Sequence, residues 1–339
     1  MTSSRVTMDD IARLAGVSVP TVSRVLNGRD GVSALTRDRV EELLREHGYR
    51  ARLPTRPGGI RLIDVIFPEI DCAWESEHIR GIEATASAAG VAMVVSSLTG
   101  GPDATEQLLR RLRLGRTDGV ILAASSSAGT MRAALSSLNV PVVALAPASR
   151  VSGEVPTVDT TNFAGAYSAT RHLMDLGHRR IAMIAGHPEI RGSQARLDGY
   201  RAALGGEGVV EAGNFYFQSG YDAARRLLAG AEPPTAIFAA NDYMALGVYE
   251  AARRAGVSVP AQLSVVGFDD LPGARWASPP LTTVRQPLRD MGGRAAGTLL
   301  ALARGDSVDT HVEMNTNLIV RESTASPQGG VQFGGERRG

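Results

Sequence analysis

The sequence contains no lysine, a single cysteine and no long apolar run. Cys72 stands alone in 339 residues, which excludes a disulfide framework within the chain and a metal site built from several cysteines. No apolar stretch reaches the roughly 18 residues of a membrane span, so we expect no membrane partner. The N-terminus, "MTSSRVTMDDIARLAG", has acids where a secretory signal carries its apolar core, and this predicts a cytoplasmic protein.

Charge is distributed unevenly along the chain. Residues 1–61 hold eleven arginines and seven acids, a net charge of +4, so the other 278 residues carry −3 of the overall +1. A basic head on a mildly acidic body indicates a nucleic-acid-binding end joined to something else. The length, about twice that of a usual domain, predicts two or three domains.

The basic head has the pattern of a helix-turn-helix. Apolar positions recur at helical spacing from Met8, Gly16 ends that first helix, and a second one runs through "VPTVSRVL" with its valines inward. The outward positions of this second helix are Thr21, Ser23 and Arg24. In such a motif the first turns of the second helix enter the DNA major groove, where arginine pairs with guanine or phosphate. A third helix follows, and the alternative interpretation is a structural three-helix unit with a solvated polar face.

The segment "VTMDDIARLAGVSVPTVSRVLNG", with the later "VS", "TRDRV" and "HGYR", resembles the N-terminal DNA-binding headpiece of LacI/GalR family bacterial transcription regulators across residues 5–50. The resemblance implies that Val19, Pro20 and Arg24 discriminate operator bases, whereas Thr21 and Ser23 contact phosphate. The candidate DNA-binding residues are Thr7, Ser18, Val19, Pro20, Thr21, Ser23, Arg24, Asn27, Tyr49 and Leu53.

The linker, residues 51–61, departs from the pattern of that family. Family members carry a hinge helix here that forms on DNA and inserts a leucine into the minor groove. In this chain Pro54, Pro57 and two glycines are poor helix residues, and Leu53 is the one candidate wedge. We therefore expect a plain basic linker whose arginines contact phosphate, with a hinge helix as the alternative.

The body, residues 62–322, alternates short β-branched runs with helical patterns. Strands such as "LIDVIF", "GVILAA" and "RRIAMIAG" are separated by helices expected over 75–89, 104–114, 131–138, 164–176, 196–204, 220–229 and 243–255. This α/β pattern predicts two doubly wound parallel sheets around a cleft. We expect lobe 1 to hold residues 62–158 and 286–315, and lobe 2 to hold residues 159–285 and 316–322. The tail, residues 323–339, is rich in Gly and Ser, and we expect it to be disordered.

Residues at the ends of these strands suit a polyol ligand, because ligands of such sheets bind beyond the carboxyl ends of the strands. Arg196 and Asp269 offer paired hydrogen bonds, Asn162 and Asn241 add amides, and an aromatic ring can stack on a sugar face. Each residue alone has a structural alternative, such as a loop cap, a surface helix position or a core aromatic. The candidate effector-binding residues are Asp71, Trp74, Ser125, Asn162, Arg196, Phe215, Asn241 and Asp269.

The family resemblance extends through "LMDLGHRRIAMIAG", "ARLDGYRAAL", "AIFAANDYMALGVYEAARRAGVSVPAQLSVVGFDDL" and "PPLTTVRQP". These segments look like the family's effector-binding domain, which is similar to periplasmic sugar-binding proteins. The resemblance implies ligand contacts for Arg196, Asn241 and Asp269 and stacking for Phe215 and Trp74. The loop "FPEIDCAWE" and the short hinge resemble the xylose-type branch of the family, so we expect a pentose or a sugar from plant polysaccharide.

The sequence thus predicts a homodimeric repressor of carbohydrate genes that binds a pseudo-palindromic operator in double-stranded DNA and is released by a small-molecule effector, a sugar. We expect no enzyme activity, cofactor or metal, because the six histidines lack metal spacing and there is no P-loop, G-x-S-x-G or H-E-x-x-H motif. Two alternatives stay open. One is a purine or phosphorylated corepressor in place of the sugar, and the other is a sugar solute-binding protein.

Overall fold

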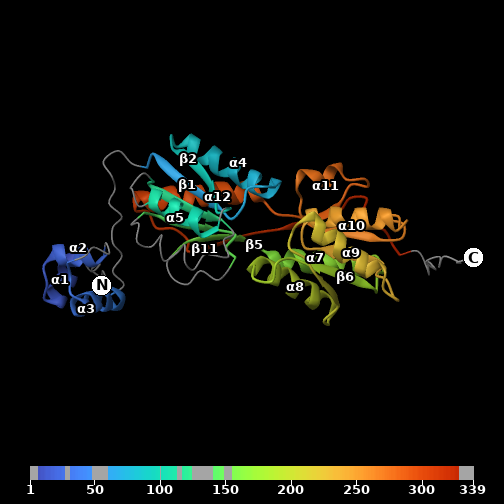
Figure 1. Ribbon diagram of the computed structural model, residues 1–339, viewed down its shortest axis with the longest axis horizontal. Coiled ribbons are helices and arrows are strands. Elements are labelled where there is room, and N and C mark those ends of the chain that lie inside the picture. The colour runs from blue at the N-terminus through green and yellow to red at the C-terminus, as the bar shows by residue number, and fades with distance from the viewer. Residues whose placement is uncertain are drawn as a thin grey trace, which may run out of the picture.

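The computed structural model describes residues 7–26, 31–47, 60–99, 101–112, 117–123, 140–148 and 155–327 (Figure 1). Several predictions from the sequence lie outside these described residues. They are the DNA contacts of Asn27, Tyr49 and Leu53, the effector contact of Ser125, the nature of the linker over 51–59, and the helix expected over 131–138.

The headpiece consists of three helices, α1 (Met8–Ala15), α2 (Val19–Leu26) and α3 (Ala34–Glu46). The hydroxyl of Thr7 accepts a hydrogen bond from the Asp10 backbone at 3.3 Å, and the Asp10 carboxylate accepts one from the Thr7 backbone at 2.9 Å, so α1 begins with a capping box. Gly16 ends α1 in the left-handed region, with φ at 68°. Five buried apolar side chains hold the three helices together: Ile11, Ala12, Val22, Val25 and Val40.

Lobe 1 is built on a six-stranded parallel sheet with the order β11-β5-β4-β3-β1-β2. Its strands are β1 (Leu62–Phe67), β2 (Ala92–Ser97), β3 (Gly119–Ala123), β4 (Val142–Leu145), β5 (Thr157–Thr160) and β11 (His311–Met314). Its helices include α4 (Ala73–Ala88), α5 (Gly101–Arg111) and α12 (Leu288–Arg304). The near-continuous burial of β1 and β3 is what a parallel sheet covered on both faces requires.

Lobe 2 is built on a second six-stranded sheet with the order β12-β10-β9-β8-β6-β7. Its strands are β6 (Ile181–Ala185), β7 (Val209–Ala212), β8 (Ala236–Ala239), β9 (Ser264–Asp269), β10 (Thr282–Arg285) and β12 (Asn317–Ile319). Its helices are α7 (Asn162–Asp175), α8 (Arg191–Leu204), α9 (Phe217–Leu228), α10 (Asp242–Arg254) and α11 (Pro272–Trp276). One pairing departs from the parallel sheet that we expected, because β12 runs antiparallel to β10.

The chain passes between the lobes three times, after β5, after β10 and after β11. Figure 1 accordingly shows α12, which is late in the chain, lying among the early elements of lobe 1. The second passage matters for the site. Strand β9 ends at Asp269, which pairs in register with Arg285 at the end of β10, and Gln286 follows at once. The first passage comes after Thr160, at the end of β5.

Three helix pairs brace the lobes: α4 with α12, α7 with α8, and α9 with α10. At the α4–α12 crossing, a Cβ on Gly81 would lie 1.8 Å from the backbone oxygen of Arg289. A Cβ on Gly292 would lie 2.2 Å from the backbone oxygen of His78. The two glycines therefore let the backbones of α4 and α12 approach more closely than any other residue would allow. This close approach fixes the position of α4 on α12.

The start of the tail is ordered, which corrects the expectation of disorder from residue 323 onward. Ser323 is fully buried, and its hydroxyl donates to the Val265 backbone oxygen at 2.6 Å and accepts from the Thr282 backbone at 2.8 Å. Two residues further on, the backbone oxygen of Ala325 lies 2.9 Å from Nε2 of the buried His178. The composition of residues 323–327 favours disorder, but these backbone groups find buried partners in lobe 2. Among the described residues, no helix is long and apolar enough to cross a membrane.

Candidate functional site

Helix α2 presents the polar face that we expected of a recognition helix. The Ser18 hydroxyl lies 3.4 Å from the Thr21 backbone nitrogen and 2.9 Å from the Thr21 hydroxyl, at the N-terminus of α2. Ser18, Pro20 and Arg24 are exposed, whereas Thr21 and Ser23 are half-buried. Val19 is also half-buried and packs on the headpiece core, so only part of its side chain is open to a base.

Arg196, on α8, is the centre of the candidate effector site in lobe 2. It is 7% exposed, its Nε donates to Oδ1 of Asn162 at 2.9 Å, and one terminal nitrogen donates to the Ala240 backbone oxygen. The guanidinium lies 3.7 Å from the centre of the Phe268 ring. Burial lowers the pKa of Arg196, and nearby carboxylates oppose this shift. Arginine keeps its charge in proteins, so a fixed cation stands inside lobe 2.

Asp269 supplies the partner charge at the end of β9. Its Oδ1 lies 3.6 Å from Nη1 of Arg196 and accepts a hydrogen bond from Nε2 of Gln286 at 2.6 Å. Burial raises the pKa of Asp269, whereas Arg196 and Gln286 lower it. Its backbone φ of 108° is strained for a residue with a side chain. Strained backbone conformations of this kind are concentrated at ligand-binding and catalytic sites.

Asn162 and Asn241 begin the helices that carry the rest of the site. We call Arg196 and the residues that contact its side chain, Asn162 and Asp269 among them, the Arg196 network. Nδ2 of Asn162 lies 3.3 Å from Oδ1 of Asp159, and this contact joins the network to the last residues of β5. Oδ1 of Asn241 caps α10 by accepting from the Met244 backbone at 2.9 Å. Nδ2 of Asn241 donates to the Phe215 backbone oxygen at 2.8 Å, so both amides are engaged and less than a tenth exposed.

Phe215 is held in an unusual backbone conformation, with φ at 74°. Its ring covers Gly186 so closely that a Cβ there would lie 2.1 Å from the ring carbon Cζ. The ring centre lies 5.9 Å from the Arg196 guanidinium. Five of the predicted effector residues therefore meet in lobe 2: Asn162, Arg196, Phe215, Asn241 and Asp269.

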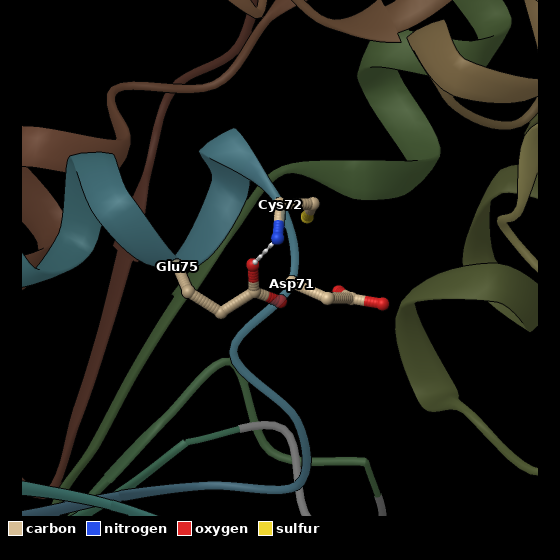
Figure 2. Close-up of side chains that lie close together, drawn as sticks. All are labelled: Asp71, Cys72 and Glu75. Atoms are coloured by element: carbon tan, nitrogen blue, oxygen red, sulfur yellow. Dashed lines mark hydrogen bonds between the residues drawn. The ribbon is translucent and has the colours of Figure 1, made fainter.

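Of the three effector residues predicted in lobe 1, Asp71 and Trp74 lie at the start of α4, and Ser125 lies outside the described residues. Trp74 is half-buried, and its ring centre lies 6.4 Å from that of Phe67, in an edge-on arrangement, and 4.2 Å from that of His78. Figure 2 shows that the exposed Asp71 carboxylate points away from α4, whereas Glu75 turns back to accept from the Cys72 backbone at 3.1 Å.

Contacts between the lobes bring these two halves together. The hydroxyl of Tyr243, on α10, accepts a hydrogen bond from the Ala73 backbone at 3.2 Å. The Arg191 backbone donates to Ala148 at 2.7 Å. The Tyr216 hydroxyl donates to the Glu69 carboxylate. The start of α4 and the strand ends of lobe 2 therefore face each other, and we call the space between them the interlobe site.

The described residues contain one cluster with metal-ligand types, namely Asp71, Cys72 and Glu75, whose ligand atoms lie within 4.8 Å of one another. Burial, with Glu75 nearby, raises the pKa of the Cys72 thiol. Metals bind the thiolate, so a thiol that holds its proton is a poor ligand, and we assign no ion to this cluster.

Sequence reasoning missed several members of the site. Asp242 and Phe268 directly adjoin predicted residues, and this adjacency was a usable signal. Asp242 is 1% exposed and accepts from the Leu271 backbone at 2.7 Å and the Thr283 hydroxyl at 2.5 Å, so it ties α10 to the residues after β9. Asp159, Gln286 and His78 come from other segments, and no sequence pattern around them indicated that they belong to the site.

Two family models match the chain. The model described as "Bacterial regulatory proteins, lacI family" matches residues 7–51, and the one described as "Periplasmic binding protein-like domain" matches residues 170–324. The first covers the headpiece and the second covers most of lobe 2 with α12, β11 and β12.

Relatives match the chain over nearly its whole length. The HTH-type transcriptional repressor CytR of Escherichia coli (strain K12) is 36% identical over 336 residues, which cover 94% of this chain and 96% of that protein. The ribose operon repressor of the same strain is 32% identical over 303 residues, which cover 87% of this chain and 92% of that protein.

Solved structures agree in fold. The transcriptional regulator CelR in complex with cellobiose has a TM-score of 0.73 at 34% identity and covers 94% of this chain and 100% of that chain. The lac repressor dimer bound to its operator and the anti-inducer ONPF has a TM-score of 0.71 at 31% identity and covers 95% of this chain and 100% of that chain.

Proposed function

The chain belongs to the LacI family of bacterial regulatory proteins and is a DNA-binding transcription regulator, and on that premise we propose that it is a repressor released from its operator by a sugar in the interlobe site. The observation that carries the proposal is the Arg196 network. A buried cation, its paired carboxylate and two amides meet beside an aromatic ring, at strand ends that face the other lobe. Ligand sites of this kind combine apolar walls with a few fixed polar groups.

The proposed mechanism is a change in lobe arrangement that the headpieces detect. Two copies of the chain bind a pseudo-palindromic operator, one half-site each. A sugar that contacts both lobes favours one arrangement, and the spacing of the headpieces changes with it. Coupling of about 1–3 kcal/mol is typical of allosteric proteins. We further propose that the protein acts in the cytoplasm and by binding alone, without a reaction of its own.

The solved relatives support a sugar as the ligand class. CelR was solved with cellobiose, and a LacI family regulator from Enterococcus faecium, 28% identical with a TM-score of 0.72, was solved with ribose. The narrower expectation of a pentose for a xylose-type regulator stays a prediction.

The test begins with selection of operator fragments from genomic DNA, followed by gel shifts with ribose, xylose and cellobiose. We expect one sugar to release the operator. Arg196→Lys should bind the operator normally but require more sugar, because lysine lacks the planar fork that arginine offers. Arg226→Lys, at a surface ion pair with Glu211, is the matched control. Specific binding by a forced monomer as tight as by the dimer would overturn the mechanism.

A further inference from the structure

One buried nitrogen at the interlobe end of lobe 1 has no hydrogen-bond partner within the described part of the chain. His78, on α4, is fully buried, and its Nε2 is one of two buried side-chain polar atoms without a partner among the described residues. Leaving such an atom unpaired destabilises the folded state, so a native protein rarely keeps one that nothing uses.

The other ring nitrogen of His78 defines what Nε2 can do. Nδ1 lies 2.9 Å from the Trp74 backbone oxygen. A carbonyl oxygen only accepts, so Nδ1 carries the hydrogen and Nε2 is left with a bare lone pair. Burial lowers the pKa of His78 to about 4, which keeps the ring neutral. Nε2 is therefore a hydrogen-bond acceptor for which the described residues supply no donor.

The surroundings of His78 add further acceptors. Glu69, Asp71 and Glu75 lie on the same loop and first turn of α4, and none of them takes part in an ion pair found within the described residues. They face lobe 2. Tyr216 donates to Glu69, and the charge of Glu75 helps to raise the pKa of Asp269. We call Glu69, Asp71, Glu75 and His78 the α4 wall.

The cations of the interlobe site are already engaged. Arg196 is shared by Asn162, the Ala240 backbone and Asp269, and Arg191 lies 3.4 Å from the Asp159 carboxylate. Among the described residues, Arg196 and Arg191 pair with Asp269 and Asp159, and neither forms an ion pair with a residue of the α4 wall. A phosphate placed there would meet carboxylates at close range in a site partly shielded from water, where like charges repel strongly.

From the bare Nε2, and from carboxylates that form no ion pair among the described residues, we infer that the interlobe site takes an unphosphorylated polyhydroxy ligand, which points a hydroxyl or amine at Nε2 of His78. The inference rests on the proposed function and narrows its ligand class. The Trp74 ring packs on the imidazole with 4.2 Å between ring centres, and the inference requires that a bound ligand displaces this ring to reach Nε2. A phosphorylated corepressor, which the sequence left open, does not fit the α4 wall.

The first experiment measures calorimetric affinities for matched probes: ribose and ribose 5-phosphate, glucose, glucosamine and glucose 6-phosphate, cellobiose, and adenosine with its 5′-monophosphate. We expect at least one unphosphorylated probe to bind, and each phosphorylated partner to bind at least about tenfold more weakly. A phosphorylated probe that binds more tightly than its parent overturns the inference but leaves effector control intact.

The second experiment uses His78→Phe, which keeps a ring beside Trp74 but has no acceptor. We expect the ligand-free variant to unfold at a higher temperature, because the unpaired nitrogen is gone, and to bind the probe about tenfold more weakly, the worth of one buried hydrogen bond. A purely structural role would leave probe affinity unchanged, and that result overturns the inference.

Glu75→Gln and Glu77→Gln form a matched pair on the same helix. Glu77 is held by Arg80 at 2.8 Å and by Arg289 at 3.5 Å, away from the α4 wall. Glu75→Gln should reduce the discrimination against phosphorylated probes, whereas Glu77→Gln should not, and equal effects count against the inference. If operator binding persists but no probe binds or releases it, the effector half of the proposed function fails, and the inference fails with it.

Discussion

At the scale of single residues, the interlobe site depends on opposite charges buried together. Arg196 and Asp269 have side chains less than a tenth exposed, and each stabilises the charge of the other where little water reaches. Such a pair adds little stability as a whole, but either member left alone is costly. In the proposed site the pair is expected to orient a ligand, and it makes a clear target for mutation.

Arg196→Ala should lower the free energy of unfolding by about 3–5 kcal/mol, because Asp269 stays buried without its cation. Urea unfolding followed by circular dichroism measures this change. Arg226→Ala is the control, since Arg226 is 56% exposed in its pair with Glu211 and should cost less than about 1 kcal/mol. Similar losses in the two variants would contradict the role assigned to Arg196.

His178 makes stability depend on pH. It is buried, with Nδ1 2.9 Å from the Thr235 hydroxyl and Nε2 3.0 Å from the Ser264 hydroxyl. Burial lowers its pKa below the ordinary value of 6.5, so the folded state holds this proton more weakly than the unfolded state does. The stability that neutral His178 contributes is present above pH 6.5 and is lost as the pH falls below it.

His178→Gln should therefore destabilise the protein more at pH 7.5 than at pH 5.5. The difference between wild type and variant changes by at most about 1.4 kcal/mol per pH unit, the limit for one proton. Urea titrations at both pH values measure it. Thr170→Val, which removes a buried hydroxyl of the same lobe without a titrating group, should cost the same at both. A His178→Gln cost that grows on acidification would show that the sign is wrong.

At the scale of elements, the position of α4 depends on how closely α12 approaches it. Gly292 touches the α4 backbone at His78, whereas Gly297, on the same helix, has nothing within 4 Å of its would-be Cβ. The two glycines therefore differ in surroundings but not in secondary structure, which makes them a matched pair.

Gly292→Ala should lower the free energy of unfolding by about 1–3 kcal/mol, because the added methyl overpacks against backbone that cannot rotate away. Gly297→Ala should instead raise it by about 0.5–1 kcal/mol, the usual gain from replacing an unconstrained glycine inside a helix. Thermal and urea unfolding of both variants measure the changes. If both substitutions act in the same direction, the close approach of α4 and α12 is not the constraint that we describe.

At the scale of the whole molecule, the lobes meet through a few polar contacts and through an apolar contact in which Leu271 and Tyr243 of lobe 2 pack on the core of lobe 1. The contact between Tyr243 and the Ala73 backbone joins α10 directly to the first turn of α4, beside the α4 wall. A contact present in one lobe arrangement biases the equilibrium towards that arrangement by its own free energy. The Tyr243 hydroxyl is therefore expected to tune the response to a ligand that draws the lobes together.

Tyr243→Phe should raise the sugar concentration for half-release of the operator by about two- to tenfold, the worth of one hydrogen bond. Fluorescence anisotropy of labelled operator DNA measures this midpoint. Tyr249→Phe is the control, because the Tyr249 hydroxyl donates to Pro279 at 3.0 Å within lobe 2. A shift of equal size in the control would mean that hydroxyl loss acts through stability and not through the lobes.

Much of this protein could be predicted because the relevant interactions are local. The capping box of α1, the left-handed glycine that ends it and the spacing of the headpiece valines all act within a few residues. The buried strands of the body are recognisable for the same reason, as apolar runs bounded by turns. Strand ends of one sheet lie along one edge, so Asn241 and Asp269 could be grouped before any contact was known. Arg196 was grouped with them, although it lies within α8 and not at a strand end.

Other structural features could not be predicted from local sequence patterns. Helix α12 was not predicted, because glycines interrupt its start, and what stabilises it is packing on α4 in a lobe that the chain left more than a hundred residues earlier. Antiparallel β12 and buried Ser323 were missed for a related reason, since their partners are distant in the sequence.

The sequence by itself determined the helix-turn-helix, the two α/β lobes and the residue types at the strand ends, because caps, periodicity and turns are short-range effects. Only the tertiary structure decided which of those residues meet. Asp269 reaches Arg196 across 73 positions, and Gln286 and Asp159 join them from the crossing segments. His78 became a candidate ligand contact only when packing buried it without a partner for Nε2. Burial and pairing of this kind depend on the whole fold, and no short stretch of chain encodes them.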